Sequence, residues 1–109
     1  MQHIKVGAAV LNQTPLDWEG NKQNISDAID EARHQGVSLL CLPELCITGY
    51  ECEDAFHGAA VKDMAWKVLL KILPATRGMV VSLGLPMLYR SALFNTACLV
   101  AARLSTPGD

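Results

Sequence analysis

The most informative part of this chain is Leu39–Tyr50, with the sequence LLCLPELCITGY. An apolar run over 39–42 is typical of a buried β-strand, and it stops at Pro43, directly before the carboxylate of Glu44. In open α/β folds, ligands bind outside the carboxyl ends of the strands. A carboxylate held there, with one side against apolar packing, is suited to act as a general base. Glu44 is therefore the first candidate catalytic residue.

Length and composition limit what surrounds this stretch. The chain has 109 residues, of which 50% are hydrophobic, and a net charge of −2, which suits one modest domain. Its lysines and arginines are scattered, so we expect no nucleic-acid partner. The apolar run over 6–11 is too short for a signal peptide or a membrane span, so we predict a cytoplasmic protein without membrane contact. The cysteines are then expected to be reduced; they are Cys41, Cys46, Cys52 and Cys98.

The sequence before the stretch predicts a strand-helix-strand unit. Residues 4–11 form a nearly continuous apolar run, which predicts a central strand buried on both faces. A helix is predicted over 19–35, where apolar residues recur at helical spacing before Gly36. A second strand over 37–42 then completes a parallel pair with a right-handed crossover. The apolar positions of the helix are Ile25, Ala28, Ile29 and Ala32.

The sequence after the stretch predicts a second helix, a third strand and a hairpin. The helix follows Gly58, runs to Ile72 and carries an apolar stripe that we assign to the core or an interface. A strand over 79–85 is expected to end at Pro86, and residues 88–89 and 93–101 are expected to pair around Arg90-Ser91. The stripe consists of Val61, Met64, Ala65, Val68, Leu69 and Ile72.

Two motifs within these elements resemble a known family. Pro43-Glu44-Leu45 with Gly49-Tyr50, followed by a helix and a strand ending at Pro86, resembles the nitrilase or carbon-nitrogen hydrolase superfamily. The extension over 48–56, with Cys52-Glu53-Asp54 and Phe56, looks most like the glutaminase domain of glutamine-dependent NAD synthetases. The resemblance covers roughly residues 4–101.

The resemblance implies an α/β fold that is part of a nitrilase-like α-β-β-α sandwich. The expected order is β-α-β-α-β plus a terminal β-hairpin, with a partial carbon-nitrogen hydrolase domain over 1–104 and a frayed tail over 105–109. Both helices would cover one face of the sheet. The other face would remain open, so we expect a homo-oligomer or a companion chain to cover it.

The resemblance also implies a chemistry. Such families use a Glu-Lys-Cys triad, in which Glu44 would be the general base and Tyr50 could line the glutamine pocket. The lysine and the cysteine follow later in the family's chain, so these 109 residues alone are expected to be inactive. ATP and magnesium would belong to a separate synthetase domain, and no cofactor or metal is expected in this chain.

Plainer explanations exist for each of these residues. Glu44 could cap a turn, Tyr50 could be a packing residue, and Glu53-Asp54 could favour a helix N-terminus. Cys41 is expected to be buried as a small hydrophobic residue, and Cys46 has no neighbouring lysine or histidine to make it a nucleophile. A zinc site is disfavoured by its spacing; its members would be Cys41, Cys46, Cys52 and His57.

Two other functions remain open at this point. The chain could be a non-catalytic binding or assembly module with the same fold. It could also be part of another carbon-nitrogen hydrolase, such as an amidase that acts on small amides.

Overall fold

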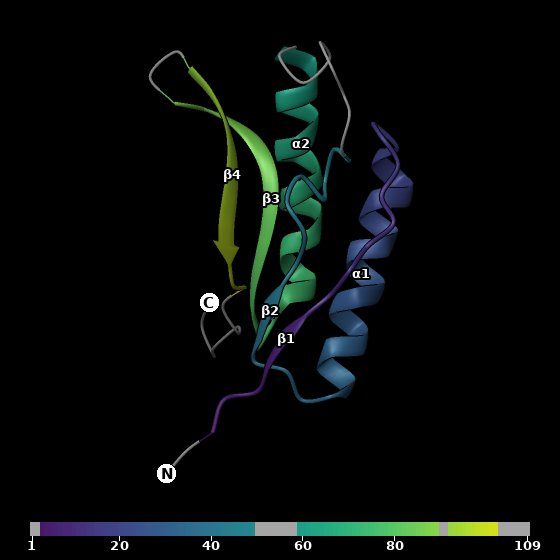
Figure 1. The fold of residues 1–109 in the computed structure, drawn as a ribbon, viewed down its shortest axis with the longest axis vertical. Helices are drawn as coiled ribbons and strands as arrows, with labels where there is room; N and C mark the ends of the chain where they lie inside the picture. The colour runs from purple at the N-terminus through teal and green to yellow at the C-terminus, as the bar shows by residue number, and fades with distance from the viewer. Residues whose placement is uncertain (1–2, 50–58, 90–91, 103–109) are drawn as a thin grey trace, which may run out of the picture.

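A computed structural model describes residues 3–49, 59–89 and 92–102, and Figure 1 shows its fold. The described residues form a sheet and two α-helices. In chain order the elements are β1 (Val6–Ala8), α1 (Trp18–His34), β2 (Leu39–Cys41), α2 (Ala59–Ile72), the 3-10 helix η2 (Leu73–Thr76), β3 (Val80–Tyr89) and β4 (Ala92–Val100).

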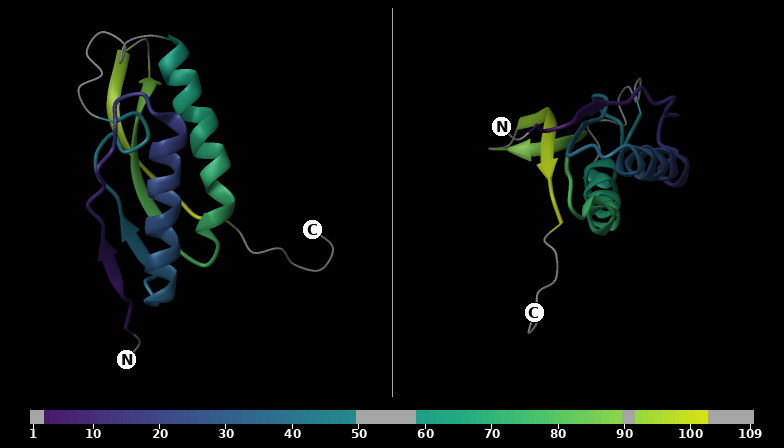
Figure 2. Two further views of the ribbon diagram at one scale, coloured as in Figure 1. Left: turned by 90° about the vertical axis from the view of Figure 1, so that its right-hand side faces the viewer. Right: turned by 90° about the horizontal axis from the view of Figure 1, so that it is seen from below.

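The sheet has four strands in the order β1-β2-β3-β4. β1, β2 and β3 are parallel, and β4 pairs antiparallel with β3. Figures 1 and 2 show α1 and α2 side by side on one face of this sheet. The predicted α/β class, with two helices on one face and a terminal hairpin, is therefore confirmed. No helix in the described ranges is long and apolar enough to cross a membrane.

Helix α1 forms where the apolar spacing predicts it, within one residue at each end. The side chain of Asp17 caps its start, because its Oδ1 accepts a hydrogen bond from the N–H of Gly20 at 3.1 Å. Gly36, with φ of +76°, follows its last turn in the left-handed conformation that ends many helices. The predicted face packs into the core, with Ile25, Ile29 and Ala32 buried.

Helix α2 buries a narrower face than its sequence predicts. Ala65, Val68, Leu69 and Ile72 are buried, but Met64 is 39% exposed. The helix packs against β3 on one side and α1 on the other, so Met64 lies beyond the covered arc. Met64 is therefore not part of the core, and its assignment to an interface stays a prediction.

Strand β1 is an edge strand of the described sheet, so the prediction of a central strand buried on both faces was wrong. Val6 is 60% exposed and Val10 is 99% exposed. A continuous apolar run does not distinguish a strand that is covered on both faces from one that is covered on a single face.

Strand β3 continues through Pro86, which we expected to end it. β2 pairs with β3 only as far as Ser82, and beyond that residue the described ladder of β3 is formed with β4 alone. A proline is tolerated where one side of a strand has no ladder partner. The predicted turn residues Arg90 and Ser91 and the tail over 105–109 lie outside the described residues.

The face of the sheet opposite the helices is largely apolar, and no helix or strand among the described residues covers it. Because side chains alternate along a strand, one row across the four strands consists of Ala8, Cys41, Ser82 and Leu99. Leu99 is 72% exposed and Cys41 is also exposed. The expected burial of Cys41 was therefore wrong, because its side chain belongs to this row. We call this surface the open face; a second row on it contains Val6, Leu39 and Val80.

Candidate active site

Glu44 lies on a turn at the carboxyl end of β2. The turn comprises residues 43–49, and we call it the Glu44 turn. The N–H of Leu42 donates to the carbonyl of Ser82 at 2.8 Å, which keeps the chain against β3 as it leaves β2. The N–H of Gly49 donates to the carbonyl of Leu45 at 2.8 Å and closes the turn. Glu44 itself is exposed, at the strand end where the sequence places it.

A pocket of about 250 Å³ lies beside the Glu44 turn. Ser82, Gly84 and Ala97 contribute to it from strand positions of the open face. Glu44 therefore borders the same side of the sheet that is uncovered. The lining residues are Leu42, Pro43, Glu44, Ser82, Leu83, Gly84, Thr96 and Ala97.

Strand β3 supports the turn through Gly84. A Cβ atom on Gly84 would lie 2.4 Å from the backbone nitrogen of Leu45, so only glycine allows this approach. The N–H of Ile47 donates to the Gly84 carbonyl at 3.4 Å. Leu45, the residue after Glu44, has φ of +48°, a conformation that is costly for leucine and that persists only where the surrounding structure determines it.

On its other side the turn receives three hydrogen bonds from residues 13–21, which comprise the approach to α1 and its first turn. Gln13 Nε2 donates to the Cys46 carbonyl at 2.6 Å, and Asn21 Nδ2 donates to the Ile47 carbonyl at 3.1 Å. The N–H of Leu16 donates to the Thr48 carbonyl at 2.7 Å.

Neither Gln13 nor Asn21 was predicted from the sequence to support this site. A signal for Asn21 was available, because it lies four positions before Ile25 and therefore continues the buried stripe of α1 with a polar side chain.

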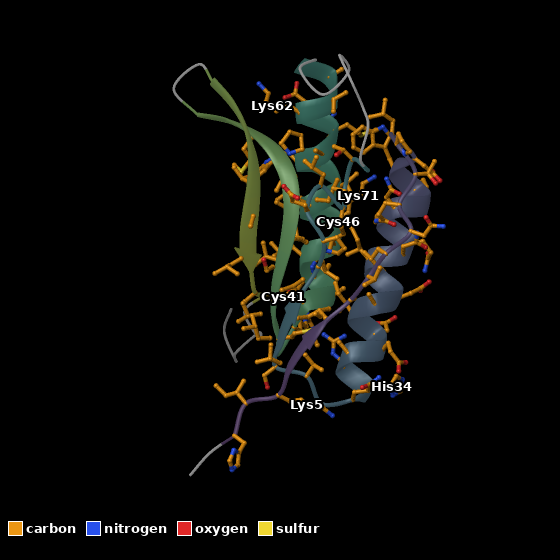
Figure 3. All side chains as sticks on the ribbon, viewed as in Figure 1. Lys5, His34, Cys41, Cys46, Lys62 and Lys71 are labelled. Carbon is orange, nitrogen blue, oxygen red and sulfur yellow. The ribbon has the colours of Figure 1, made fainter. Side chains whose placement is uncertain are left out.

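Cys46, labelled in Figure 3, is a buried residue of the Glu44 turn and is not suited to be a nucleophile. Burial raises the pKa of its thiol to about 11, and backbone hydrogen bonds at Gly84 and at Cys46 itself offset only part of this rise. A thiol with this pKa is almost entirely protonated near pH 7. Its position agrees with the expectation that Cys46 does not replace a missing catalytic cysteine.

Several predicted site residues cannot be placed. Tyr50, the candidate for the glutamine pocket, lies outside the described residues, as do Glu53 and Asp54. Two of the four residues of the alternative zinc site, Cys52 and His57, also lie outside the described residues. Within the described ranges, no group of three or more His, Cys, Asp or Glu side chains could hold a metal ion.

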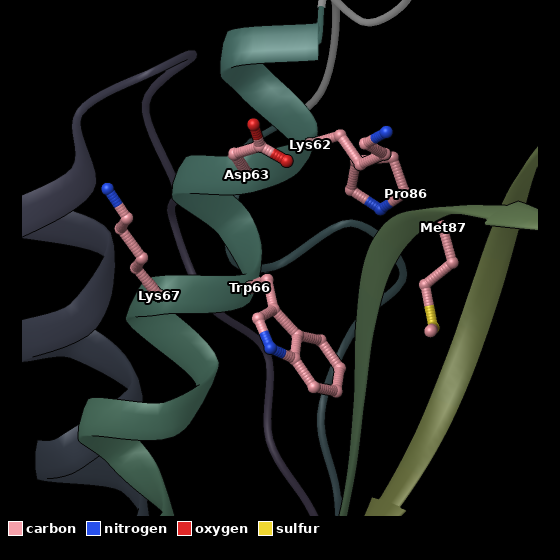
Figure 4. A pocket seen from close by; sticks show the side chains of 6 residues that line it. All are labelled: Lys62, Asp63, Trp66, Lys67, Pro86 and Met87. Carbon is pink, nitrogen blue, oxygen red and sulfur yellow. The ribbon is translucent and has the colours of Figure 1, made fainter.

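A larger pocket, of about 560 Å³, lies away from Glu44 between α2 and β3 (Figure 4). Trp66, which is 47% exposed, lines it, and the remaining lining residues are Lys62, Asp63, Lys67, Pro86 and Met87. Despite its size, we place the candidate active site at Glu44. That residue stands at the carboxyl end of a parallel strand on a strained turn that two parts of the chain support.

Known proteins are similar to this chain in both sequence and fold. Residues 5–108 match the carbon-nitrogen hydrolase family. The glutamine-dependent NAD(+) synthetase of Drosophila melanogaster is 38% identical over 100 residues, which are 90% of this chain and 12% of that protein. The crystal structure of a glutamine-dependent NAD(+) synthetase from Cytophaga hutchinsonii has a TM-score of 0.87 and 49% identity over 90% of this chain and 17% of that one.

An amidase from Nesterenkonia sp. is a more distant structural relative. It has a TM-score of 0.72 and 26% identity over 89% of this chain and 38% of the amidase. The chain spans 38% of the amidase but only 12% of the Drosophila synthetase and 17% of the Cytophaga hutchinsonii synthetase. The match over nearly all of its length, together with the shared fold, shows that this chain belongs to the carbon-nitrogen hydrolase family.

Proposed function

We propose that this chain supplies the general base, Glu44, of a glutamine-hydrolysing site that delivers ammonia for NAD synthesis. The observation that carries the proposal is the position of Glu44 at the carboxyl end of β2, beside a pocket and on a turn supported from two sides. The relatives with the higher identity are glutamine-dependent NAD synthetases, which favours glutamine over the small amides of the amidase alternative.

In the proposed reaction the Glu44 carboxylate accepts the proton of a cysteine thiol. The thiolate attacks the side-chain amide carbon of glutamine, and a lysine stabilises the negative charge on the oxygen of the tetrahedral intermediate. Ammonia leaves with the proton that Glu44 returns, and a glutamyl thioester remains. Glu44 then takes a proton from a water molecule as the water oxygen attacks the thioester, glutamate is released as the carbon–sulfur bond breaks, and Glu44 returns the proton to the cysteine sulfur.

The other residues and the cofactors of the proposed reaction would lie outside the described residues of this chain. The lysine and the cysteine would come from a further part of the domain, and Tyr50 would line the glutamine pocket. ATP and magnesium would serve a separate synthetase domain, in which ammonia reacts with an adenylated dinucleotide. A cytoplasmic location also stays a prediction.

A chimera tests the proposal directly. The segment of the Cytophaga hutchinsonii synthetase that matches this chain is replaced by these 109 residues, and NAD formation is measured with glutamine and, separately, with ammonia. We expect Glu44→Gln to lower the glutamine-dependent rate by about a hundredfold or more, as loss of a general base does, and to leave the ammonia-dependent rate unchanged. Glu19→Gln, an equally small change on the exposed first turn of α1, is the matched control.

If Glu44→Gln keeps the glutamine-dependent rate of the Glu19→Gln control, Glu44 is not the general base. If the unsubstituted chimera uses ammonia but not glutamine, the chain does not form a glutaminase site, and the non-catalytic alternative is favoured.

A further inference from the structure

Three consecutive carbonyl groups of the Glu44 turn are held by one segment of the chain. The carbonyls of Cys46, Ile47 and Thr48 accept hydrogen bonds from residues 13–21, and two of these bonds come from side chains. The chain around Glu44 is therefore attached to the start of α1 and does not depend only on the turn's own backbone.

Both the amide nitrogen and the amide oxygen of Asn21 form hydrogen bonds in this arrangement. Asn21 is 1% exposed, its Oδ1 accepts from the N–H of Thr14 at 2.9 Å, and its Nδ2 donates to the carbonyls of Thr14 and Ile47. An apolar side chain of the same size would fit the buried stripe of α1 but would leave the N–H of Thr14 and the carbonyl of Ile47 without the partner that Asn21 provides. An asparagine at this position thus joins two loops.

Gln13 makes a second link of the same kind. Its Nε2 donates to the Cys46 carbonyl at 2.6 Å and to the Asn21 carbonyl at 3.1 Å. Its Oε1 accepts from Asn24 Nδ2 at 2.8 Å, which fixes the orientation of the amide.

The opposite side of the turn rests on Gly84, so the turn is held between β3 and the entry to α1. Leu45 keeps a left-handed conformation there, and a strained residue of this kind persists only when its surroundings determine it. We infer that Asn21 and Gln13 are positioning residues that hold the Glu44 turn in this conformation. That the positioned carboxylate is a general base rests on the function proposed above.

Alkylation of Cys46 in the 109-residue chain reports on the turn. The buried thiol reacts slowly with iodoacetamide while the turn is closed, and fragment-ion mass spectrometry separates it from the other cysteines. We expect Gln13→Glu to raise its alkylation rate about tenfold or more, because the variant keeps the side-chain volume and loses the donor to Cys46. The added carboxylate disfavours the thiolate, so its charge cannot cause the increase. Gln23→Glu, on the exposed part of α1, adds the same charge and is the control.

Asn21→Ala is the second variant, and Ile29→Val is its control. Ile29→Val removes a methyl group about two helical turns after Asn21 and breaks none of the hydrogen bonds that hold the Glu44 turn, so it shows how much the alkylation rate rises when only global stability is reduced. We expect Asn21→Ala to exceed this amount by about tenfold and to displace the ¹H–¹⁵N amide signals of Glu44 and Leu45, which Ile29→Val leaves in place.

The inference is overturned if both variants alkylate Cys46 no faster than their controls, or only in proportion to their global stability. Because the measurement needs no catalysis, an inactive chimera would not affect it. Conversely, an unaltered turn in these variants would leave Glu44 as the proposed base.

Discussion

At the scale of single residues, Cys46 attaches the turn that carries Glu44 to the hydrophobic core. It follows Glu44 by two positions, yet its side chain is fully buried and its thiol forms a hydrogen bond with the Gly84 carbonyl at 3.9 Å. Burial disfavours the thiolate and raises the pKa of this thiol to about 11. The residue therefore acts as a small hydrophobic side chain that anchors the turn.

This pKa makes a testable contribution to the pH dependence of stability. Below pH 9, the ordinary pKa of a thiol here, both folded and unfolded chains hold the proton and the contribution is complete. Between pH 9 and about 11 only the unfolded chain ionises, so the free energy of unfolding falls by about 1.4 kcal/mol per pH unit from this group. Urea titrations over this range should show a shallower decline for Cys46→Ala. Parallel declines in the two proteins would contradict the assignment.

At the scale of elements, the contact between the Glu44 turn and β3 depends on the absence of a side chain at Gly84. The backbone of Leu45 occupies the place where a Cβ atom would be. Two elements that are far apart in sequence therefore meet backbone to backbone, and this contact sets how far the turn stands above the sheet.

Gly84→Ala should lower the free energy of unfolding by about 2 kcal/mol, the scale of an overpacked core position, because the added methyl group meets backbone that cannot rotate away. Gly7→Ala is the control, since its Cβ atom would meet only side-chain atoms, the nearest of them a methyl group of Val37 at 3.2 Å. We expect that change to cost less than about 1 kcal/mol in chemical denaturation. Equal losses for the two variants would show that the contact is not tight.

Elements in which apolar residues recur at a regular spacing were predictable from the sequence, whereas the elements that pack beside them were not. Helical spacing places α1 within one residue, and Pro43-Glu44 locates the end of β2 and the candidate base. The apolar run around Val6 gave the wrong position in the sheet, since apolarity does not tell which face has a partner.

Contacts between distant residues were harder still to predict. Strand β3 continues through Pro86 because only β4 pairs with it there, and the hydrogen bond from Asn21 to Ile47 joins residues 26 positions apart. Such contacts depend on tertiary structure, which a local pattern does not contain.

At the scale of the whole molecule, the two faces of the sheet differ strongly. One is covered by α1 and α2, and the other exposes apolar side chains, among them Val6 at 60%, Val80 at 38% and Leu99 at 72%. Contiguous apolar surface of this kind usually marks an interface. We propose that the open face packs against further protein, either another part of the same domain or a companion chain.

If this is so, the 109 residues alone should self-associate and bind a hydrophobic dye, because apolar surface in water costs about 25 cal/mol per Å². Leu99→Lys should reduce both effects in sedimentation velocity and dye-binding measurements. Leu70→Lys, on the exposed surface of α2, is the control and should change neither. A monomer that binds no dye before substitution would contradict the proposal.

The hydrogen bonds of the Glu44 turn also have a consequence for the order of folding. Gln13 and Cys46 are 33 residues apart, and Cys46 and Gly84 are 38 residues apart, so the contacts that fix the turn close long loops. Long-range contacts of this kind form late, after local ones such as the pairing of β3 with β4. On the ribosome, the glutamate can reach its final geometry only after β3 has emerged, about forty residues after Glu44 itself. The candidate base would therefore be among the last parts of this chain to become ordered.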